Sequence, residues 1–195
     1  SSARIVNAEG YTTDIDVPAT LPYNEGEIPV TAIEHNFGDD ANIATVDLSK
    51  TSITTTPSFR NCSSLETVLL PSTLETINEY TFANCDNLQS IDLSGTNVKG
   101  IDSWAFDGCD NLTTIVFPST LETIGNSAFN SCRKIQEIDL SNTKLTTIGE
   151  CAFQYCNELC SLSLPASLKK IGNYAFYDNY ALRDLDLSMV EEIGD

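Results

Sequence analysis

The sequence predicts an elongated solenoid of stacked repeats, and two regularities in the chain of 195 residues carry this prediction. Seven of the eight phenylalanines recur at spacings of 22 to 24 residues, at Phe37, Phe59, Phe82, Phe106, Phe129, Phe153 and Phe176. A short segment of alternating apolar and polar residues also recurs once in each period. A fixed period in the twenties is typical of stacked repeats, in which neighbouring units share one continuous core.

Cysteines keep the same phase, three residues after the phenylalanine. They are Cys62, Cys85, Cys109, Cys132 and Cys156, with Asp40 and Asn179 at the equivalent positions of the first and last repeats. Stacking holds equivalent Cβ vectors parallel, which is unsuited to a disulfide, so we expect a buried ladder of free thiols. Cys151 and Cys160 lie outside this ladder, and we expect them to be more exposed.

Each period also contains a strand-like segment such as Ile91-Asp92-Leu93, with the two-residue alternation of a half-buried strand. Stacking would pair these segments in a parallel sheet with rungs ~4.8 Å apart. A second apolar pair follows, for example Leu121 and Ile124, and then a glycine such as Gly125, where a tight corner favours an unhindered backbone. No helical periodicity longer than one turn is present, so we expect few helices.

The segment from Leu121 to Cys132 (LETIGNSAFNSC), followed by Ile135 and Ile138-Asp139-Leu140, resembles the repeat of the BspA-like leucine-rich repeat family. The resemblance covers roughly residues 30–195. The expected fold is therefore a right-handed leucine-rich-repeat solenoid of about seven ~23-residue repeats, with short parallel strands and turns. The resemblance also implies a cell-surface or secreted protein that acts in adhesion.

We expect two structural parts. Residues 1–29 lack the Phe-Cys unit and contain strand-like stretches around a glycine turn, so we assign them to an N-terminal β cap. Residues 30–195 form the solenoid, and the segment from Met189 to Asp195 begins another unit but stops before its Ala-Phe pair. We therefore expect that the C-terminal end is cut within a repeat and that the native protein continues.

A longer period, of two repeats, is superimposed on the period of 22 to 24 residues. The segment after each strand alternates between Asp-Leu-Ser, at Asp47, Asp92, Asp139 and Asp186, and a pattern that ends at Pro71, Pro118 or Pro165. The structural unit is one repeat, but the sequence unit is a pair of repeats. Duplication of a pair explains this pattern.

The charge excludes several classes of partner. Twenty-eight acidic and ten basic residues give a net charge of −18. A polyanion gains no affinity for nucleic acid or anionic membranes through counterion release, and no apolar run reaches the ~20 residues of a membrane span. We expect a monomer that binds neither nucleic acid nor membrane.

The sequence offers little for catalysis, so we expect no enzyme activity and no cofactor. The one histidine, His35, lies in a column two residues before each phenylalanine, with Pro57, Tyr80, Trp104, Ser127, Cys151 and Tyr174. Such a mixed column is expected to face outward, unconstrained by packing. Cys156 and Cys160 have the spacing of one zinc-binding pair, but no second pair follows, so we expect no metal site.

Two surfaces are candidates for binding. The first is the outward column after each strand centre, formed by Asp47, Leu69, Asp92, Val116, Asp139, Ser163 and Asp186. Solenoids commonly use such faces to bind proteins, although an acidic face can also serve solubility alone. The second is the aromatic pair Tyr80 and Trp104 on adjacent rungs, which would either stack on sugar rings or pack along the flank.

We therefore predict a non-catalytic binding module that adheres to extracellular or cell-surface proteins of a host or a neighbouring cell. The alternatives are a carbohydrate-binding module that uses the aromatic pair, and a passive spacer within a longer surface protein. The expected location is secreted or at the cell surface.

Overall fold

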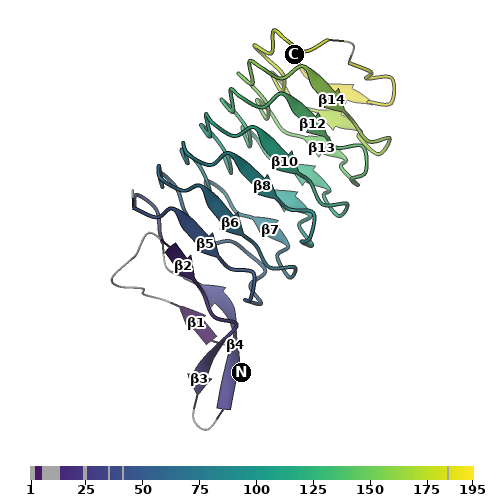
Figure 1. Cartoon of the computed structure of the whole chain (residues 1–195). Coiled ribbons are helices and arrows are strands. Elements are labelled where there is room, and N and C mark those ends of the chain that lie inside the picture. Colours follow the sequence, from purple (N-terminus) through teal and green to yellow (C-terminus); the bar gives the residue numbers. More distant parts are fainter. Residues whose placement is uncertain (1–2, 6–13, 24–25, 35, 41, 184) are drawn as a thin grey trace.

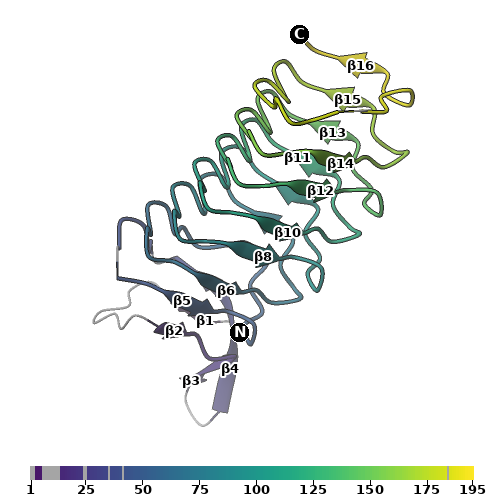
Figure 2. The same ribbon diagram turned by 45° about the horizontal axis from the view of Figure 1, so that its top comes forward.

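The computed structural model describes residues 3–5, 14–23, 26–34, 36–40, 42–183 and 185–195. The described residues form the strands β1 to β16 and no helix. The strands stack as rungs from the N-terminal to the C-terminal end of an elongated molecule (Figures 1 and 2). The predicted parallel β-solenoid is therefore confirmed.

Four strands form the N-terminal part: β1 (Ala3–Ile5), β2 (Asp14–Asp16), β3 (Thr20–Tyr23) and β4 (Gly26–Ile33). In this part, β4 pairs with β1 in parallel and with β3 in antiparallel orientation. In contrast, β2 pairs in parallel with the first strand of the repeats. The expected boundary between residues 29 and 30 falls inside β4, whose Val30 is buried in the core.

The front face, as we call it, is the side of the solenoid that carries the three-residue strands of the repeats (Figure 1). These strands are β5 (Thr45–Asp47), β6 (Thr67–Leu69), β8 (Ser90–Asp92), β10 (Thr114–Val116), β12 (Glu137–Asp139) and β14 (Ser161–Ser163). From β5 to β12 the middle residue of each strand is buried, and the two outer residues point away from the core. The alternation predicted from the sequence is therefore present.

A second sheet runs along the solenoid beside the front face. It consists of β7 (Thr76–Ile77), β9 (Gly100–Ile101), β11 (Thr123–Ile124), β13 (Thr147–Ile148), β15 (Lys170–Ile171) and β16 (Glu192–Ile193). All six strands pair in one continuous parallel ladder. Their isoleucines are buried as far as Ile171, whereas Ile193 on the last rung is 53% exposed.

The phenylalanine column forms the centre of the core. Consecutive rings from Phe37 to Phe176 stack with centroids 5.0 to 5.7 Å apart and with interplanar angles of no more than 20°. The rings from Phe37 to Phe153 are at most 2% exposed, whereas Phe176 is half-buried at the last rung. Each ring therefore covers the next, and the core is continuous along the solenoid.

The cysteine ladder is also present, and each thiol has a defined partner. The Sγ atoms of Cys62, Cys85, Cys109, Cys132 and Cys156 donate to the backbone carbonyl of the phenylalanine in the preceding repeat, over 3.0 to 3.3 Å. Asn179 replaces the thiol in the last repeat, where its Nδ2 donates to the Phe153 carbonyl over 2.9 Å. All seven cysteines are free, and burial raises the pKa of Cys62 to about 11 and that of Cys156 to about 12.

The loop around each phenylalanine has a repeated backbone conformation. Two residues before the ring, Tyr80, Trp104, Ser127, Cys151 and Tyr174 all have φ between 53° and 57°. Two residues after the ring, φ is again positive, as at Asn84 (58°), Gly108 (70°) and Ser131 (60°). The prediction that the column before the ring is unconstrained by packing was wrong, because Pro57 is buried, and the five members named above share a left-handed conformation that L-residues rarely adopt. His35 lies outside the described residues.

The glycines after the second apolar pair permit close contact between rungs. A Cβ atom on Gly125, Gly149 or Gly172 would lie 2.5 to 2.7 Å from backbone atoms of the preceding rung. Real side chains essentially never show such distances. Glycine is therefore needed here because the backbone of the neighbouring repeat leaves no room for a Cβ atom, in addition to the tightness of the corner.

Candidate functional site

The predicted outward column lies along the front face. Pairing places Asp47 beside Leu69, Asp92 beside Val116, and Asp139 beside Ser163. All of these side chains are exposed except Asp47, which is half-buried. Asp186 keeps the same phase in the last repeat and is exposed, although no strand forms there.

The strands of the front face pair in blocks. One sheet contains β2, β5 and β6, a second contains β8 and β10, and a third contains β12 and β14. Among the described residues, no strand pairing joins β6 to β8 or β10 to β12. The breaks follow the repeats that contain Pro71 and Pro118, so they have the two-repeat period of the sequence.

The residue directly after the strand is placed differently in the Asp-Leu-Ser repeats and in the proline repeats. After an Asp-Leu-Ser strand the leucine is fully buried, as at Leu48 and Leu93, and its N–H donates to the next strand. In a proline repeat the equivalent residues, Leu70 and Phe117, are only half-buried. Proline has no N–H and restricts the preceding residue, so this repeat cannot turn in the same way.

A groove lies at each of these two breaks and a third lies after β14, and we call these three hollows the sheet grooves. Their volumes are about 300 Å³ between β6 and β8, about 450 Å³ between β10 and β12, and about 370 Å³ between β14 and the following rung. Each is lined by the strand-centre residue of the proline repeat and the aspartate of the next repeat. These pairs are Val68 with Asp92, Ile115 with Asp139, and Leu162 with Asp186.

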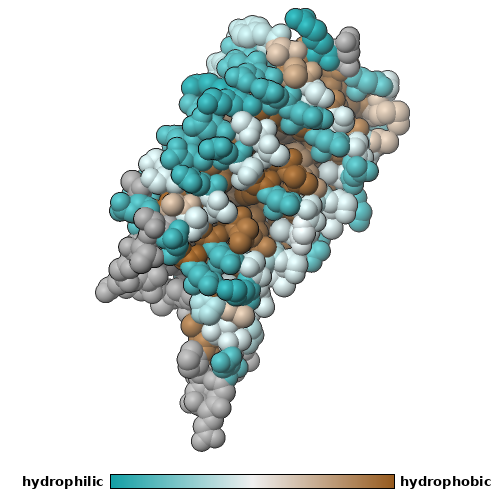
Figure 3. All heavy atoms as spheres, in the orientation of Figure 1, coloured by the Kyte–Doolittle hydropathy of each residue, from teal (hydrophilic) through white to brown (hydrophobic). Residues whose placement is uncertain are grey.

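The grooves are partly apolar. Val68 and Ile115 are 7% and 9% exposed, whereas Ile91 and Ile138, at the centres of the Asp-Leu-Ser strands, are 2% and 1% exposed. Leu69 and Val116 lie on the same strands as Val68 and Ile115, and they are 49% and 43% exposed. Figure 3 shows apolar surface over β6 and β10, with more polar surface around it.

The aspartates of the column are held in place by the serines two residues later. The backbone N–H groups of Ser94, Ser141 and Ser188 donate to Oδ1 of Asp92, Asp139 and Asp186 over 2.8 to 2.9 Å. The hydrogen bonds from Ser141 lower the pKa of Asp139, and those from Ser188 lower the pKa of Asp186. These two carboxylates are therefore ionised at neutral pH.

The aromatic pair packs against itself. The rings of Tyr80 and Trp104 stack with centroids 5.1 Å apart and an interplanar angle of 9°. The guanidinium carbon of Arg60 lies 4.9 Å from the centroid of the Tyr80 ring. Both aromatic residues are half-buried, so of the two possibilities that the sequence left open, packing along the flank describes them better.

Sequence comparison identifies the repeat. The profile of the BspA type Leucine rich repeat region matches residues 27–112 and 76–195, in six copies. The chain belongs to the BspA-type leucine-rich repeat family. No curated protein sequence matches the chain.

Solved structures agree with this BspA-type assignment. A leucine rich cell surface protein from Faecalibacterium prausnitzii has 25% identity and a TM-score of 0.72, over 98% of this chain and 50% of that protein. The leucine rich repeat protein of T. pallidum has 30% identity and a TM-score of 0.58, over 65% of this chain and 68% of that one. A leucine-rich repeat protein from Bacteroides ovatus, 23% identical with a TM-score of 0.62, matches 93% of this chain and 53% of its own, which supports the fold. The chain thus spans about half the length of the Faecalibacterium and Bacteroides proteins.

The BspA-type solenoid also exposes tyrosines that the sequence reasoning did not select. Tyr155, Tyr174, Tyr177 and Tyr180 are 38%, 47%, 49% and 73% exposed. The Tyr177 ring makes edge contacts with Tyr155 and Tyr174, at centroid distances of 6.0 and 5.9 Å. The sequence could have indicated these residues, because tyrosine is concentrated in the loops around Phe153 and Phe176.

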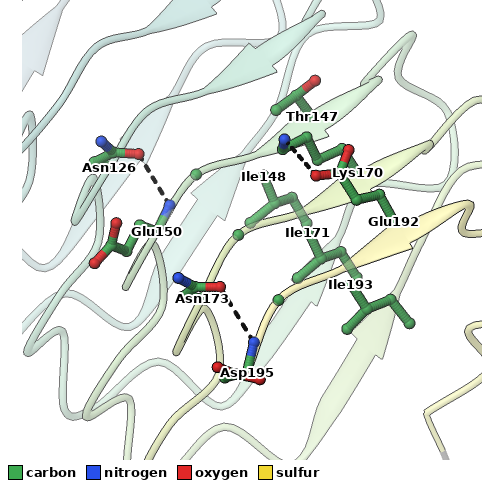
Figure 4. A pocket seen from close by; sticks show the side chains of 13 residues that line it. Asn126, Thr147, Ile148, Glu150, Lys170, Ile171, Asn173, Glu192, Ile193 and Asp195 are labelled. Atoms are coloured by element: carbon green, nitrogen blue, oxygen red, sulfur yellow. Dashed lines mark hydrogen bonds and ion pairs between the residues drawn. The ribbon is translucent and has the colours of Figure 1, made fainter.

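A larger hollow lies along the second sheet, with a volume of about 590 Å³ (Figure 4). Its polar groups already bind one another. The Oδ1 atoms of Asn126 and Asn173 accept the backbone N–H groups of Glu150 and Asp195, and Lys170 forms an ion pair with Glu192. The hollow follows the glycine corners at Gly149, Gly172 and Gly194.

The described residues contain no group of histidine, cysteine or acidic side chains arranged to hold a metal ion. No helix in the described part of the chain could cross a membrane.

Proposed function

We propose that this chain is a non-catalytic module that binds extracellular or cell-surface proteins through its front face. The single observation that carries the proposal is the column in which Asp47 and Asp92 lie beside the exposed Leu69 and Val116 on neighbouring strands. Protein interfaces combine apolar contacts at the centre with polar groups around them. The proposed binding residues are Asp47, Leu69, Asp92, Val116, Asp139, Ser163 and Asp186.

The mechanism is the sum of several weak contacts on a surface that is ordered before binding. Strand pairing holds the column in register within each block, and the stacked phenylalanines run from one block to the next. A partner therefore causes little loss of conformational entropy in this chain when it binds. The excess of acidic residues favours partners with a basic surface.

We also propose that the protein is secreted or attached to the cell surface. The likeness to the Faecalibacterium leucine rich cell surface protein supports this location.

A further proposal is that residues 1–29 cap the N-terminal end of the solenoid. The pairing of β2 with β5 and the burial of Val30 in the core support this role.

The test is a binding screen of the purified chain against immobilised extracellular-matrix proteins at low and high salt. We expect at least one protein to bind, with affinity that falls as salt screens the carboxylates. The double variant Asp92→Asn and Asp139→Asn should weaken this binding about tenfold or more. The double variant Asp102→Asn and Glu122→Gln has the same charge change beside the second sheet and is the matched control. Binding that is indifferent to the double variant of Asp92 and Asp139 would exclude the front face.

Carbohydrate recognition is the second candidate. The exposed tyrosine group of Tyr155, Tyr174, Tyr177 and Tyr180 now supports it better than the self-stacked Tyr80 and Trp104. A glycan array with the wild-type chain and Tyr177→Ala tests it, because loss of a hit in this variant would assign binding to the tyrosines. If the chain binds neither proteins nor glycans, the passive spacer becomes the better description.

A further inference from the structure

We propose that a trough on the flank of the solenoid binds the pyranose ring of a neutral saccharide against the Trp104 indole. The residues that line this flank trough, as we call it, are Trp104, Ser127, Cys151, Gln154 and Tyr174. The inference rests on carbohydrate recognition, the second candidate function, and gives it a defined site. It does not involve the front face.

The trough arises from the column that lies two residues before each phenylalanine. In this column Tyr80, Trp104, Ser127, Cys151 and Tyr174 have φ between 53° and 57°. Equal backbone angles direct the Cα–Cβ bonds of equivalent residues the same way, so neighbouring rings of the column can stack. Tyr80 and Trp104 do so, with centroids 5.1 Å apart. Ser127 and Cys151 carry no ring, so two consecutive ring positions lie between Trp104 and Tyr174 without an aromatic side chain.

The distance between the two aromatic ends suits a sugar ring. From Phe106 to Phe176, in the same loops, the stacked rings advance by 5.0, 5.2 and 5.6 Å, so the positions of Trp104 and Tyr174 are about 16 Å apart along the stack. A pyranose ring carries substituents on both faces and is thicker than an aromatic ring. Two consecutive positions without a ring accommodate this thickness.

A second column forms the other side of the trough. In each loop, the residue after the phenylalanine donates its backbone N–H to the carbonyl of the first column. Asn130 donates in this way to Ser127 over 3.1 Å. Gln154 donates to Cys151 over the same distance. The two columns therefore lie side by side, and the Gln154 amide belongs to the same flank as the rings.

The Trp104 ring has one covered face. Tyr80, on the preceding rung, stacks on that face, and Arg60 lies 4.9 Å from the centroid of the Tyr80 ring. Among the residues that the structure describes, no ring stacks on the opposite face of Trp104. The next member of the column on that side is Ser127, with a single hydroxymethyl group. The negative face of an aromatic ring attracts the weakly positive C–H groups of a sugar.

The polar groups of the trough favour a hydroxylated ligand over a purely apolar one. Ser127 and Gln154 are half-buried, and within the described part of the chain their side chains have no hydrogen-bond partner. A hydroxyl and an amide both donate and accept, as sugar hydroxyls do. An apolar ring in the trough would bury these groups without partners, which costs free energy.

Charge restricts the class further. The two columns contain no basic residue between Trp104 and Tyr174, and the net charge of the chain is −18. An acidic saccharide would therefore be repelled, and it would find no cation in the trough. A neutral saccharide has neither disadvantage.

The experiment uses the natural reporter of the site, because Trp104 is the only tryptophan of the chain. The probes are the neutral disaccharides lactose, cellobiose, maltose, chitobiose and mannobiose. We expect at least one of them to change the tryptophan fluorescence saturably, with a Kd of about 1 mM or lower. Calorimetry should give the same Kd.

Two variants remove the site by opposite means. Trp104→Ala deletes the ring on which the sugar packs, whereas Ser127→Tyr places a ring over it. Tyr80 and Tyr174 have the same positive φ as Ser127, so tyrosine is compatible with this position. Both variants should lower the affinity at least tenfold, as measured by calorimetry. Ser161→Tyr is the matched control at an exposed position of β14 and should retain it.

Circular dichroism spectra and urea unfolding of each variant establish that the fold is intact. If none of the five disaccharides binds, the inference is wrong. Binding that survives both Trp104→Ala and Ser127→Tyr would also overturn it.

Two further variants separate this inference from the proposed functions. The double variant Asp92→Asn and Asp139→Asn changes only the front face, so it should bind the disaccharide normally. If Tyr177→Ala abolishes disaccharide binding while both trough variants retain it, the exposed tyrosines bind carbohydrate and the trough does not. If no disaccharide binds but a matrix protein loses affinity for the double variant, the proposed function of the front face stands and this inference fails.

Discussion

The Sγ atom of Cys109 lies 3.0 Å from the backbone carbonyl oxygen of Phe82, one repeat earlier, and donates a hydrogen bond to it. Four other cysteines repeat this contact, so the thiols join the loops of adjacent repeats where no strand pairing operates. Each of these cysteines is completely buried, so water cannot reach the carbonyl oxygen from the side of the thiol. Each of these buried carbonyl oxygens also accepts the backbone N–H three residues later, so the ladder supplies the second of its two hydrogen bonds.

We predict that Cys109→Ala lowers the free energy of unfolding by about 1–3 kcal/mol, because it removes one of the two hydrogen bonds that the Phe82 carbonyl accepts and creates a small cavity. Urea unfolding followed by circular dichroism measures the change. Cys160→Ala is the matched control, since Cys160 is exposed, and it should change stability by no more than about 0.5 kcal/mol. Equal effects of the two substitutions would show that the ladder contact does not stabilise the fold.

Stability should fall at alkaline pH. Burial raises the pKa of Cys62 to about 11 and that of Cys156 to about 12, while the unfolded chain ionises its thiols near pH ~8.5. The unfolded state therefore loses protons first, and stability that is complete below pH ~8.5 is lost as pH rises towards the folded values. Each thiol contributes a slope of at most ~1.4 kcal/mol per pH unit.

Urea unfolding between pH 8 and pH 11 measures this slope. Cys156→Ala should give a shallower decline by the share of one thiol, whereas Cys160→Ala should leave it unchanged. Identical slopes for the wild type and Cys156→Ala would contradict the assignment to the ladder.

We predict opposite outcomes for alanine at two glycines. A Cβ at Gly149 would lie 2.6 Å from the backbone N of Asn126, so Gly149→Ala should cost about 1–3 kcal/mol or more, because the neighbouring rung must move. A Cβ at Gly95 meets nothing within 4 Å, so Gly95→Ala should be nearly neutral. Thermal unfolding of both variants checks the prediction. A stable Gly149→Ala would show that the rungs can separate at little cost.

Replacing a phenylalanine of the stack by alanine should reduce the free energy of unfolding most in the interior of the stack. Phe129 is fully buried between two parallel rings, so Phe129→Ala should lower the free energy of unfolding by about 3–5 kcal/mol. Phe176 is half-buried and has a ring on one side, so Phe176→Ala should have a clearly smaller effect. Chemical unfolding of the two variants at one pH gives the comparison. Equal losses would argue against a stack that is continuous along the solenoid.

The repeat core could be predicted from the sequence because its determinants are local and periodic. Phenylalanine, cysteine and a strand-centre aliphatic residue each recur at one phase, and a phase that is apolar in nearly every repeat is expected to face the core. The outward column could be placed for the same reason, since residues on either side of a buried strand centre point outward.

The features that were missed depend on contacts between rungs. The alternation of serine and proline after the strands was visible, but its consequence, a broken pairing after Pro71 and Pro118, depends on hydrogen bonds between different repeats. The stacking of Tyr80 on Trp104 likewise occurs where the backbone is left-handed. The residue types in that column do not predict this conformation.

The two sheets differ in continuity, and this difference has a mechanical consequence. The second sheet joins six strands without interruption, so it resists stretching along the solenoid axis. The front face consists of separate blocks, which backbone hydrogen bonds do not tie together at every second rung. The solenoid therefore has one stiff side and one compliant side, and bending concentrates at the breaks. Because a tilt of one block changes the width of the groove beside it, a force on the ends of the molecule would alter the shape of its front face.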